Sequence, residues 1–147
     1  MIRHIYILLL LSLSFGQFQF QTTEELQEAV DLWVSDNDSA LSTYGEINSW
    51  DVSLIEDMSE LFKDKTTFND DIGNWDVSSV TDMDDMFYSA DALSDGNKCA
   101  IHTSFSSNEN WTYDWSEFCL AGCTDPEACN YDQTATADDG SCEYFDC

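Results

Sequence analysis

Apolar and polar positions along the chain repeat with a period of 25 residues. Residues 47–62 return as residues 72–87, and eight of the sixteen positions are identical, whereas average residue usage would leave roughly one. The replacements keep their apolar character, since Val80 stands for Ile55 and Met86 for Leu61. A fixed period between about 20 and 50 residues is typical of stacked-repeat proteins. Because such proteins offer a long surface, the pattern favours binding over catalysis.

Each repeat predicts the same two short elements. Apolar residues alternate with Ser, Thr, Asp and Glu, and the β-branched ones favour a short strand at 54–58 and again at 79–83. The following segments, 59–64 and 84–90, lack Gly and Pro. They therefore predict one or two helical turns after each strand.

Residues 22–36 predict an N-terminal helix that covers the open end of the repeats. Thr22 and Glu25 have the spacing of a capping box. In this motif the Thr22 side chain accepts a hydrogen bond from the N–H of Glu25, and the Glu25 side chain accepts one from the N–H of Thr22. Apolar residues then recur on one helical face: Leu26, Ala29, Val30, Trp33 and Val34. Residues 37–44 are predicted to be a polar connection. The alternative for the helix is an independent amphipathic binding element.

The regular pattern ends after Leu93. A turn signal at 95–97 precedes a segment rich in aromatic residues, which Cys99 and Cys119 bracket. We predict a disulfide across this segment, which would stabilise the region by about 3 kcal/mol in the chain-entropy model. Residues 94–121 are therefore expected to form the C-terminal cap of the stack.

Residues 1–16 predict an export signal. A short basic start at Arg3 and His4 precedes an apolar run over 5–11, and mostly small or polar residues follow as far as Gly16. The run is too short to anchor the chain in a bilayer. We expect a secreted or cell-surface protein that does not span the membrane once processed. The alternative is a buried N-terminal helix.

Charge narrows the choice of partners. Thirty acidic residues face four basic ones, which gives a net charge of −26 at pH 7. Such a surface repels phosphate backbones, so nucleic-acid binding is not expected, and it also disfavours anionic membranes. It suits solubility and cation binding, although most of the carboxylates are expected to be hydrated.

All six cysteines lie in the last third of the chain. An even count in an exported chain favours disulfides. Zinc is the competing interpretation, but no Cys-x-x-Cys pair is present and His102 is the only His beyond the predicted leader. Residues 122–147 form a separate module that needs cross-links or metal, because they contain almost no aliphatic side chains. Of the three connectivities of its four cysteines, we favour Cys123–Cys142 with Cys129–Cys147.

The same module carries the sharpest candidate site, which is one for calcium. Calcium takes about six to eight oxygen ligands, and five oxygen-bearing side chains lie close together in sequence: Asp125, Asn130, Asp132, Asp138 and Asp139. Gly140 permits a sharp turn, but the order departs from the EF-hand pattern and Glu143 follows too soon for a bidentate ligand. Calcium is the candidate cofactor. The alternative is a disulfide-stapled loop of Asx turns with hydrated carboxylates.

Aromatic residues suggest carbohydrate binding as an alternative function. Trp50 and Trp75 stand at equivalent repeat positions, so both are expected to pack between layers rather than to stack on a sugar. Trp111, Tyr113 and Trp115 lie outside the repeats and are less committed to the core. These three are the candidate ligand-binding aromatics.

The repeated acids do not predict an enzyme. Asp51 and Asp76, like Asp57 and Asp82, occur as two copies of the same residue, whereas a glycoside hydrolase needs one unequal pair of carboxyl groups. Asp51 and Asp76 are instead expected to accept hydrogen bonds from backbone N–H groups two positions on. A Ser/His/Asp set is not expected from a chain with one His beyond the predicted leader, and the sequence has no Gly-rich phosphate loop.

The motif Trp-Asp-Val-Ser-x-Val-Thr-x-Met-x-x-Met-Phe at 75–87 resembles the BspA-type leucine-rich-repeat surface proteins, and residues 50–62 are a second copy. The resemblance implies an exported protein with an α/β fold, a short leucine-rich-repeat-like solenoid of strands and helical segments behind an N-terminal capping helix, over 22–93. Residues 122–142 resemble a short Cys/Asp module that recurs in exported multidomain proteins of bacteria.

Together these patterns predict an exported, non-catalytic repeat protein that acts as an interaction or adhesion module. Its expected partner is an unidentified protein or glycan at a surface. The alternative is a carbohydrate-binding module that uses the aromatic residues of the segment 105–118.

Overall fold

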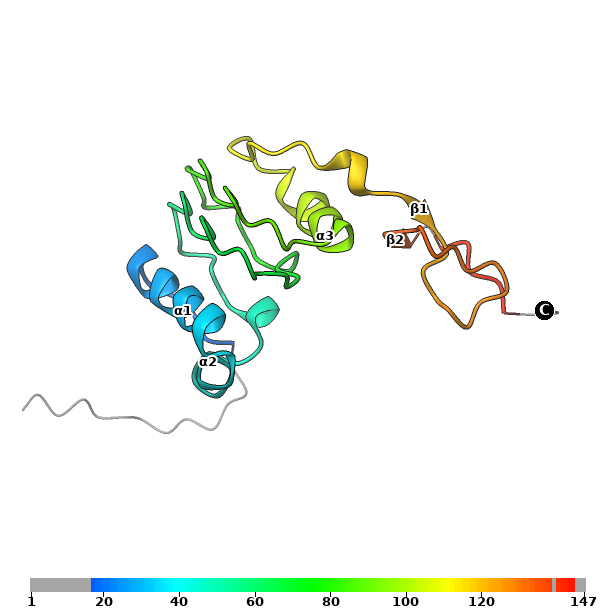
Figure 1. Ribbon diagram of the computed structural model, residues 1–147. Helices are drawn as coiled ribbons and strands as arrows, with labels where there is room; N and C mark the ends of the chain where they lie inside the picture. The colour runs from blue at the N-terminus through cyan, green and yellow to red at the C-terminus, as the bar shows by residue number, and fades with distance from the viewer. Residues whose placement is uncertain (1–16, 139, 145–147) are drawn as a thin grey trace, which may run out of the picture.

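The computed structural model describes residues 17–138 and 140–144. In these residues the helices are α1 (Thr23–Ser35), α2 (Asn37–Tyr44) and α3 (Asp95–Phe105), with 3-10 turns η1 (Ile47–Ser49) and η2 (Ser116–Phe118). Two short strands, β1 (Ala121–Gly122) and β2 (Ala137–Asp138), pair in parallel (Figure 1). The predicted signal peptide lies outside the described residues.

Helix α1 begins where the sequence predicts. The Thr22 hydroxyl accepts the Glu25 N–H at 3.2 Å, but Glu25 reaches back to the N–H of Gln21 rather than to that of Thr22. Asp36 is both the last cap of α1 and the first cap of α2. Its carboxylate accepts a hydrogen bond from the N–H of Ser39, in the first turn of α2. The prediction of a polar connection over 37–44 is therefore wrong. Only Ala40 of α2 is buried, so the segment has no apolar stripe to reveal a helix.

The two repeats, residues 47–71 and 72–93, lie side by side. Alternate residues of the first repeat donate their N–H groups to carbonyls 24 positions further on, at 2.8–2.9 Å: Met58 to Asp82, Glu60 to Asp84, Phe62 to Met86, and Asp64 to Tyr88. On the other side of the first repeat, the N–H of Phe20 donates to Asp51 and the N–H of Asp51 donates to Phe18. The first repeat thus has backbone neighbours on both sides.

Neither the predicted strands nor the predicted helical turns form in the repeats. Bridges in the described part of the repeats are single residue pairs, such as Asp57 with Asp82. Between the donors to the neighbouring repeat, N–H groups turn back to carbonyls three residues earlier, as Leu61 does to Met58. Left-handed backbone recurs 25 residues apart, at Glu60 and Asp85 with φ of 58° and 53°. Because cross-repeat bonds alternate with tight turns, neither a ladder nor a helix propagates.

The core between the repeats is aromatic. The rings of Trp50 and Trp75 are stacked with centroids 6.2 Å apart, and each residue is 2 % exposed. The prediction that these residues pack between layers is confirmed. The Phe62 ring stacks on those of Phe68 and Phe87, at 4.2 and 5.2 Å.

Helix α3 begins where the sequence predicts a turn, because the Ser94 hydroxyl accepts the N–H of Asn97 and starts a helix there. This helix packs directly on the second repeat. A Cβ added at Gly73 would lie 3.0 Å from the carbonyl oxygen of Ala100, so the close approach needs a glycine at this position. The disulfide Cys99–Cys119 then ties α3 to the segment that follows η2.

The C-terminal module is built differently from the repeats. Figure 1 shows it beyond η2, apart from the repeats. The disulfide Cys123–Cys142 closes it, and Cys123 and Ala128 are its buried apolar residues in the described part. Both described disulfides are pairs that the sequence predicts, whereas the predicted pair Cys129–Cys147 includes a residue outside the described ones.

Candidate interaction surface

The outer edge of the second repeat carries backbone donors at the positions whose donors in the first repeat bond to the second. Positions equivalent to Met58, Glu60, Phe62 and Asp64 are Met83, Asp85, Phe87 and Ser89. The N–H of Phe87 donates to the Tyr113 hydroxyl at 2.9 Å. For the N–H groups of Met83, Asp85 and Ser89, no hydrogen-bond acceptor is found within 17–138 and 140–144. Of the four donors along this edge, the N–H of Phe87 is therefore the one that has an acceptor among the described residues.

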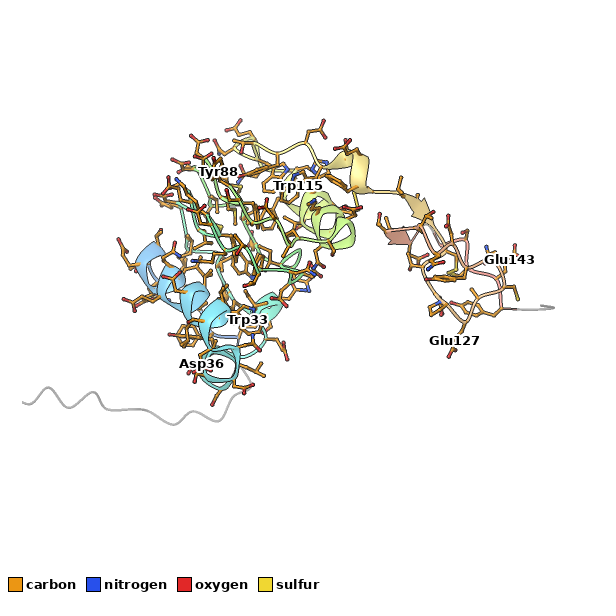
Figure 2. The ribbon with its side chains drawn as sticks, viewed as in Figure 1. Trp33, Asp36, Tyr88, Trp115, Glu127 and Glu143 are labelled. Carbon is orange, nitrogen blue, oxygen red and sulfur yellow. A yellow bond between two sulfur atoms is a disulfide. The ribbon has the colours of Figure 1, made fainter. Side chains whose placement is uncertain are left out.

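Acidic side chains surround these donors. Tyr88 is 56 % exposed, and exposed carboxylates flank it: Asp82, Asp84, Asp85 and Asp91. Figure 2 shows Tyr88 at the end of the repeats distant from Trp33 and Asp36. Charges on an exposed edge oppose pairing with a like chain. We call Tyr88, the four acids and the free N–H groups of Asp85 and Ser89 the acidic edge.

The candidate sugar-binding aromatics lie beside this edge and pack on Phe87. The ring centroids of Trp111, Tyr113 and Trp115 lie 6.2, 5.9 and 5.2 Å from the Phe87 ring, and all three are half-buried. The indole N–H of Trp111 donates to Nδ1 of His102 at 3.2 Å. Burial raises the pKa of Tyr113. These contacts support core packing of the three residues and leave sugar stacking a prediction.

The repeated acids hold turns, as the sequence predicts for Asp51 and Asp76. Their Oδ1 atoms accept the N–H groups of Ser53 and Ser78 at 3.1 and 3.0 Å. The Ser53 hydroxyl lowers the pKa of Asp51, and the Ser78 hydroxyl lowers that of Asp76. Both carboxylates are thus kept ionised as acceptors, the opposite of what a general acid needs.

An open cleft of about 600 Å³ lies between the second repeat and the segment after α3. Its walls come from residues 75–81 and 104–110. The Asn108 amide crosses from one wall to the other and donates to the carbonyls of Val77 and Val80, at 2.7 and 2.8 Å. The cleft is hence fixed by protein contacts. Its position depends on tertiary structure, and nothing in the spacing of these residues predicts it.

The candidate calcium ligands make hydrogen bonds within the module. The Asp125 carboxylate accepts from Tyr144 and Glu127, the Asp132 carboxylate from Thr134, the Asp138 carboxylate from Gly140, and the Asn130 carbonyl from Glu143. The Glu127 N–H lowers the pKa of Asp125, and the Thr134 hydroxyl lowers that of Asp132. Asp139 lies outside the described residues. No cluster of three or more His, Cys, Asp or Glu side chains suited to a metal is found in the described part of the chain. Calcium binding stays a prediction.

Taken with the 25-residue period, the paired repeats and the aromatic cap define a small repeat protein. Residues 17–118 match the family model described as "Mycoplasma protein of unknown function, DUF285". The chain belongs to this family. The match covers α1, both repeats and most of the cap, and it ends before the C-terminal module. Membership of this family agrees with a surface-associated repeat protein.

A second comparison gives a short local similarity. The chain is 50% identical over 58 residues to the chloroplastic ribulose bisphosphate carboxylase/oxygenase activase of Spinacia oleracea. That stretch is 38% of this chain, and it spans 12% of the length of the relative. No solved structure matches the chain. Among the described helices, none is both long and apolar enough to cross a membrane.

Proposed function

We propose that this chain is an exported, non-catalytic repeat protein that acts as an interaction module at a surface, with adhesion as its specific role. The fold class we propose for it is a short leucine-rich-repeat-like solenoid. The acidic edge is the observation that carries the proposal, because it joins free backbone donors at Asp85 and Ser89 with an exposed Tyr88. The disulfides and the family membership agree with an extracellular or surface location.

The partner that fits this edge is a protein surface with carbonyl acceptors and basic side chains. Carbonyls would pair with the free N–H groups as a neighbouring repeat does. Lys and Arg side chains would pair with the carboxylates of Asp84 and Asp85 and speed association by long-range attraction. The chain carries a net charge of −26, so a neutral or acidic partner gains nothing from this attraction.

An array of purified extracellular proteins tests the proposal. The oxidised protein is biotinylated and compared with the double variant Asp84→Asn/Asp85→Asn and with Tyr88→Ala. Asn tolerates the left-handed backbone at position 85, where φ is 53°, so the double variant should fold. Leu54→Ala is the matched control, because Leu54 is 51 % exposed in the first repeat.

The expected result is binding to a basic array protein that both edge variants weaken about tenfold or more and that the control leaves unchanged, since hot-spot side chains dominate interfaces. Raised salt should slow association. Equal binding by edge variants and control, or no binding to any protein on the array, would contradict the proposal.

A further inference from the structure

The cleft between the second repeat and the segment after α3 has the size of a small-molecule site. Its volume is about 600 Å³, inside the range of about 300–1,000 Å³ that is common for such sites. It is separate from the acidic edge, since Tyr88 and the exposed acids beside it are absent from its walls. A ligand in it would therefore be independent of the proposed protein partner.

The walls of this cleft are fixed before any ligand arrives. The Asn108 amide joins them through two carbonyls of the second repeat, and the Asn110 amide donates to the Val80 carbonyl at 3.3 Å. Asn108 Oδ1 in turn accepts the N–H of Asn110 at 2.8 Å. A ligand would thus bind a pre-formed site, which lowers the ordering cost of binding.

Acceptor groups with spare capacity line the cleft. The Asp76 carboxylate accepts from Ser78, and a carboxylate has about four acceptor positions. Neither the Glu109 carboxylate nor Asn110 Oδ1 accepts a hydrogen bond from any described residue, although both residues line the cleft. These groups call for a ligand with several O–H or N–H donors.

The remaining lining restricts the ligand further. Among the described residues, no Lys, Arg or His lines the walls, so a phosphate, sulfate or carboxylate would meet Asp76 and Glu109 without a counter-charge. Trp75, Val77 and Val80 also line the cleft, but these residues are almost fully buried, so the apolar part of its surface is small. A ligand with many hydroxyl donors and no negative charge fits this lining, and a neutral sugar has both features.

We propose that this cleft binds a neutral saccharide, whose hydroxyl groups donate to Asp76, Glu109 and Asn110. The hydroxyls of Ser78 and Thr81, which also line the cleft, can accept or donate as the sugar requires. The three aromatics of the cap take no part in the site, because they are not among its lining residues.

An NMR titration of the full, oxidised, ¹⁵N-labelled protein tests this site directly. The probes are glucose, galactose, mannose and N-acetylglucosamine, followed by cellobiose, lactose and chitobiose. The signals to follow are the side-chain amides of Asn108 and Asn110 and the backbone amides of Ser78 and Glu109, which line the cleft. The expected result is saturable shifts of these signals with one class of sugar, and unmoved indole signals from Trp111 and Trp115.

Two variants and a matched control sharpen the test. Asp76→Asn and Glu109→Gln should each raise the Kd about tenfold or more, because each replaces a charge-assisted acceptor by a neutral one. Asp51→Asn should leave the Kd unchanged, since Asp51 holds the equivalent turn of the first repeat and lies outside the cleft. Thermal unfolding of the three variants checks that all are folded.

Three outcomes would overturn the proposal. No saturable shift with any of the sugars is the first. Shifts confined to Trp111 and Trp115 would move the sugar site to the cap. Binding that Asp51→Asn weakens as much as Asp76→Asn, or that disappears in raised salt, would mean non-specific association rather than a sugar site in the cleft, because binding of a neutral sugar is insensitive to screening.

Discussion

The two repeats carry the same residue pattern and differ in what surrounds them. The first lies between residues 17–20 and the second repeat, and the rings of Phe20, Trp33, Tyr44 and Trp75 all contact its Trp50. In the second repeat, Trp75 contacts the rings of Trp50 and Phe62 and also borders an open cleft. The repeat pattern thus encodes a turn and a core position, while the place of a repeat in the stack decides which of its groups stay open for a partner.

Removing the equivalent indoles should have the largest effect. Trp50→Ala and Trp75→Ala are each expected to cost about 3–5 kcal/mol of unfolding free energy, as truncation of a buried aromatic does. Trp50→Ala should cost more, because it loses more ring contacts and leaves a closed cavity. Urea unfolding of the oxidised proteins measures both values. A larger loss for Trp75→Ala would show that the second repeat is the more enclosed one.

Opening the cap disulfide should affect the second repeat more than the first. Replacing Cys99 and Cys119 by Ser is expected to cost about 3 kcal/mol in the chain-entropy model, and amide protection should fall first in residues 72–93, on which α3 packs. The pair Cys123→Ser/Cys142→Ser is the control, which should leave the unfolding of the repeats unchanged. Equal losses of protection in both repeats would contradict the expectation.

The Tyr113 hydroxyl accepts the N–H of Phe87, as a backbone carbonyl of a third repeat would. Tyr113→Phe should cost about 1 kcal/mol, because the N–H of Phe87 loses its acceptor while the ring keeps its packing. Exchange of the Phe87 amide should speed up, and that of the Phe62 amide should not, since it donates to the Met86 carbonyl. Tyr88→Phe, at an exposed tyrosine, should change neither the stability nor the exchange.

The smallest effect should appear in acid. The pKa values of Asp51 and Asp76 are lowered below 3.8 in the folded protein, chiefly by the hydroxyls of Ser53 and Ser78. A lowered folded-state pKa gives stability that is present above 3.8 and is lost as the pH falls through the lower value. Wild type should therefore lose stability relative to Asp51→Asn and Asp76→Asn over this range. The loss of stability should be larger for the Asp51 comparison than for the Asp76 comparison. Asp51 also accepts a hydrogen bond from Gln19, whereas the negative charge of Asp51 opposes the lowering of the Asp76 pKa. Thermal unfolding at several acidic pH values measures the differences, and a constant difference would contradict the sign.

Residue patterns predict the parts of this molecule that side-chain chemistry decides. The cap of α1 at Thr22, the burial of Trp50 and Trp75, and the pair Cys99–Cys119 follow from residue type and spacing. Helix α2 is missed, because its polar sequence buries only Ala40. The start of α3 is missed because Asp and Gly suit a helix's first turn as well as a loop.

The open groups of the second repeat could not be predicted for a different reason. A free N–H at Asp85 or Ser89 depends on which backbone lies beside it, and the sequence of the repeat is the same whether or not a neighbour is present. The cleft is a similar case, since the contacts of Asn108 with Val77 and Val80 join segments about 30 residues apart in the chain. Tertiary position, which residue type does not report, creates both features.

Amide hydrogen exchange at matched positions of the two repeats distinguishes an open outer edge from a covered one. Because Glu60 and Asp64 donate to the second repeat, their amides should be strongly protected in the oxidised protein. The amides of Asp85 and Ser89, at the same positions 25 residues later, should exchange close to the rate of an unprotected chain. Equal protection at the four positions would mean that the edge is covered, and it would contradict both the open edge and the function proposed for it.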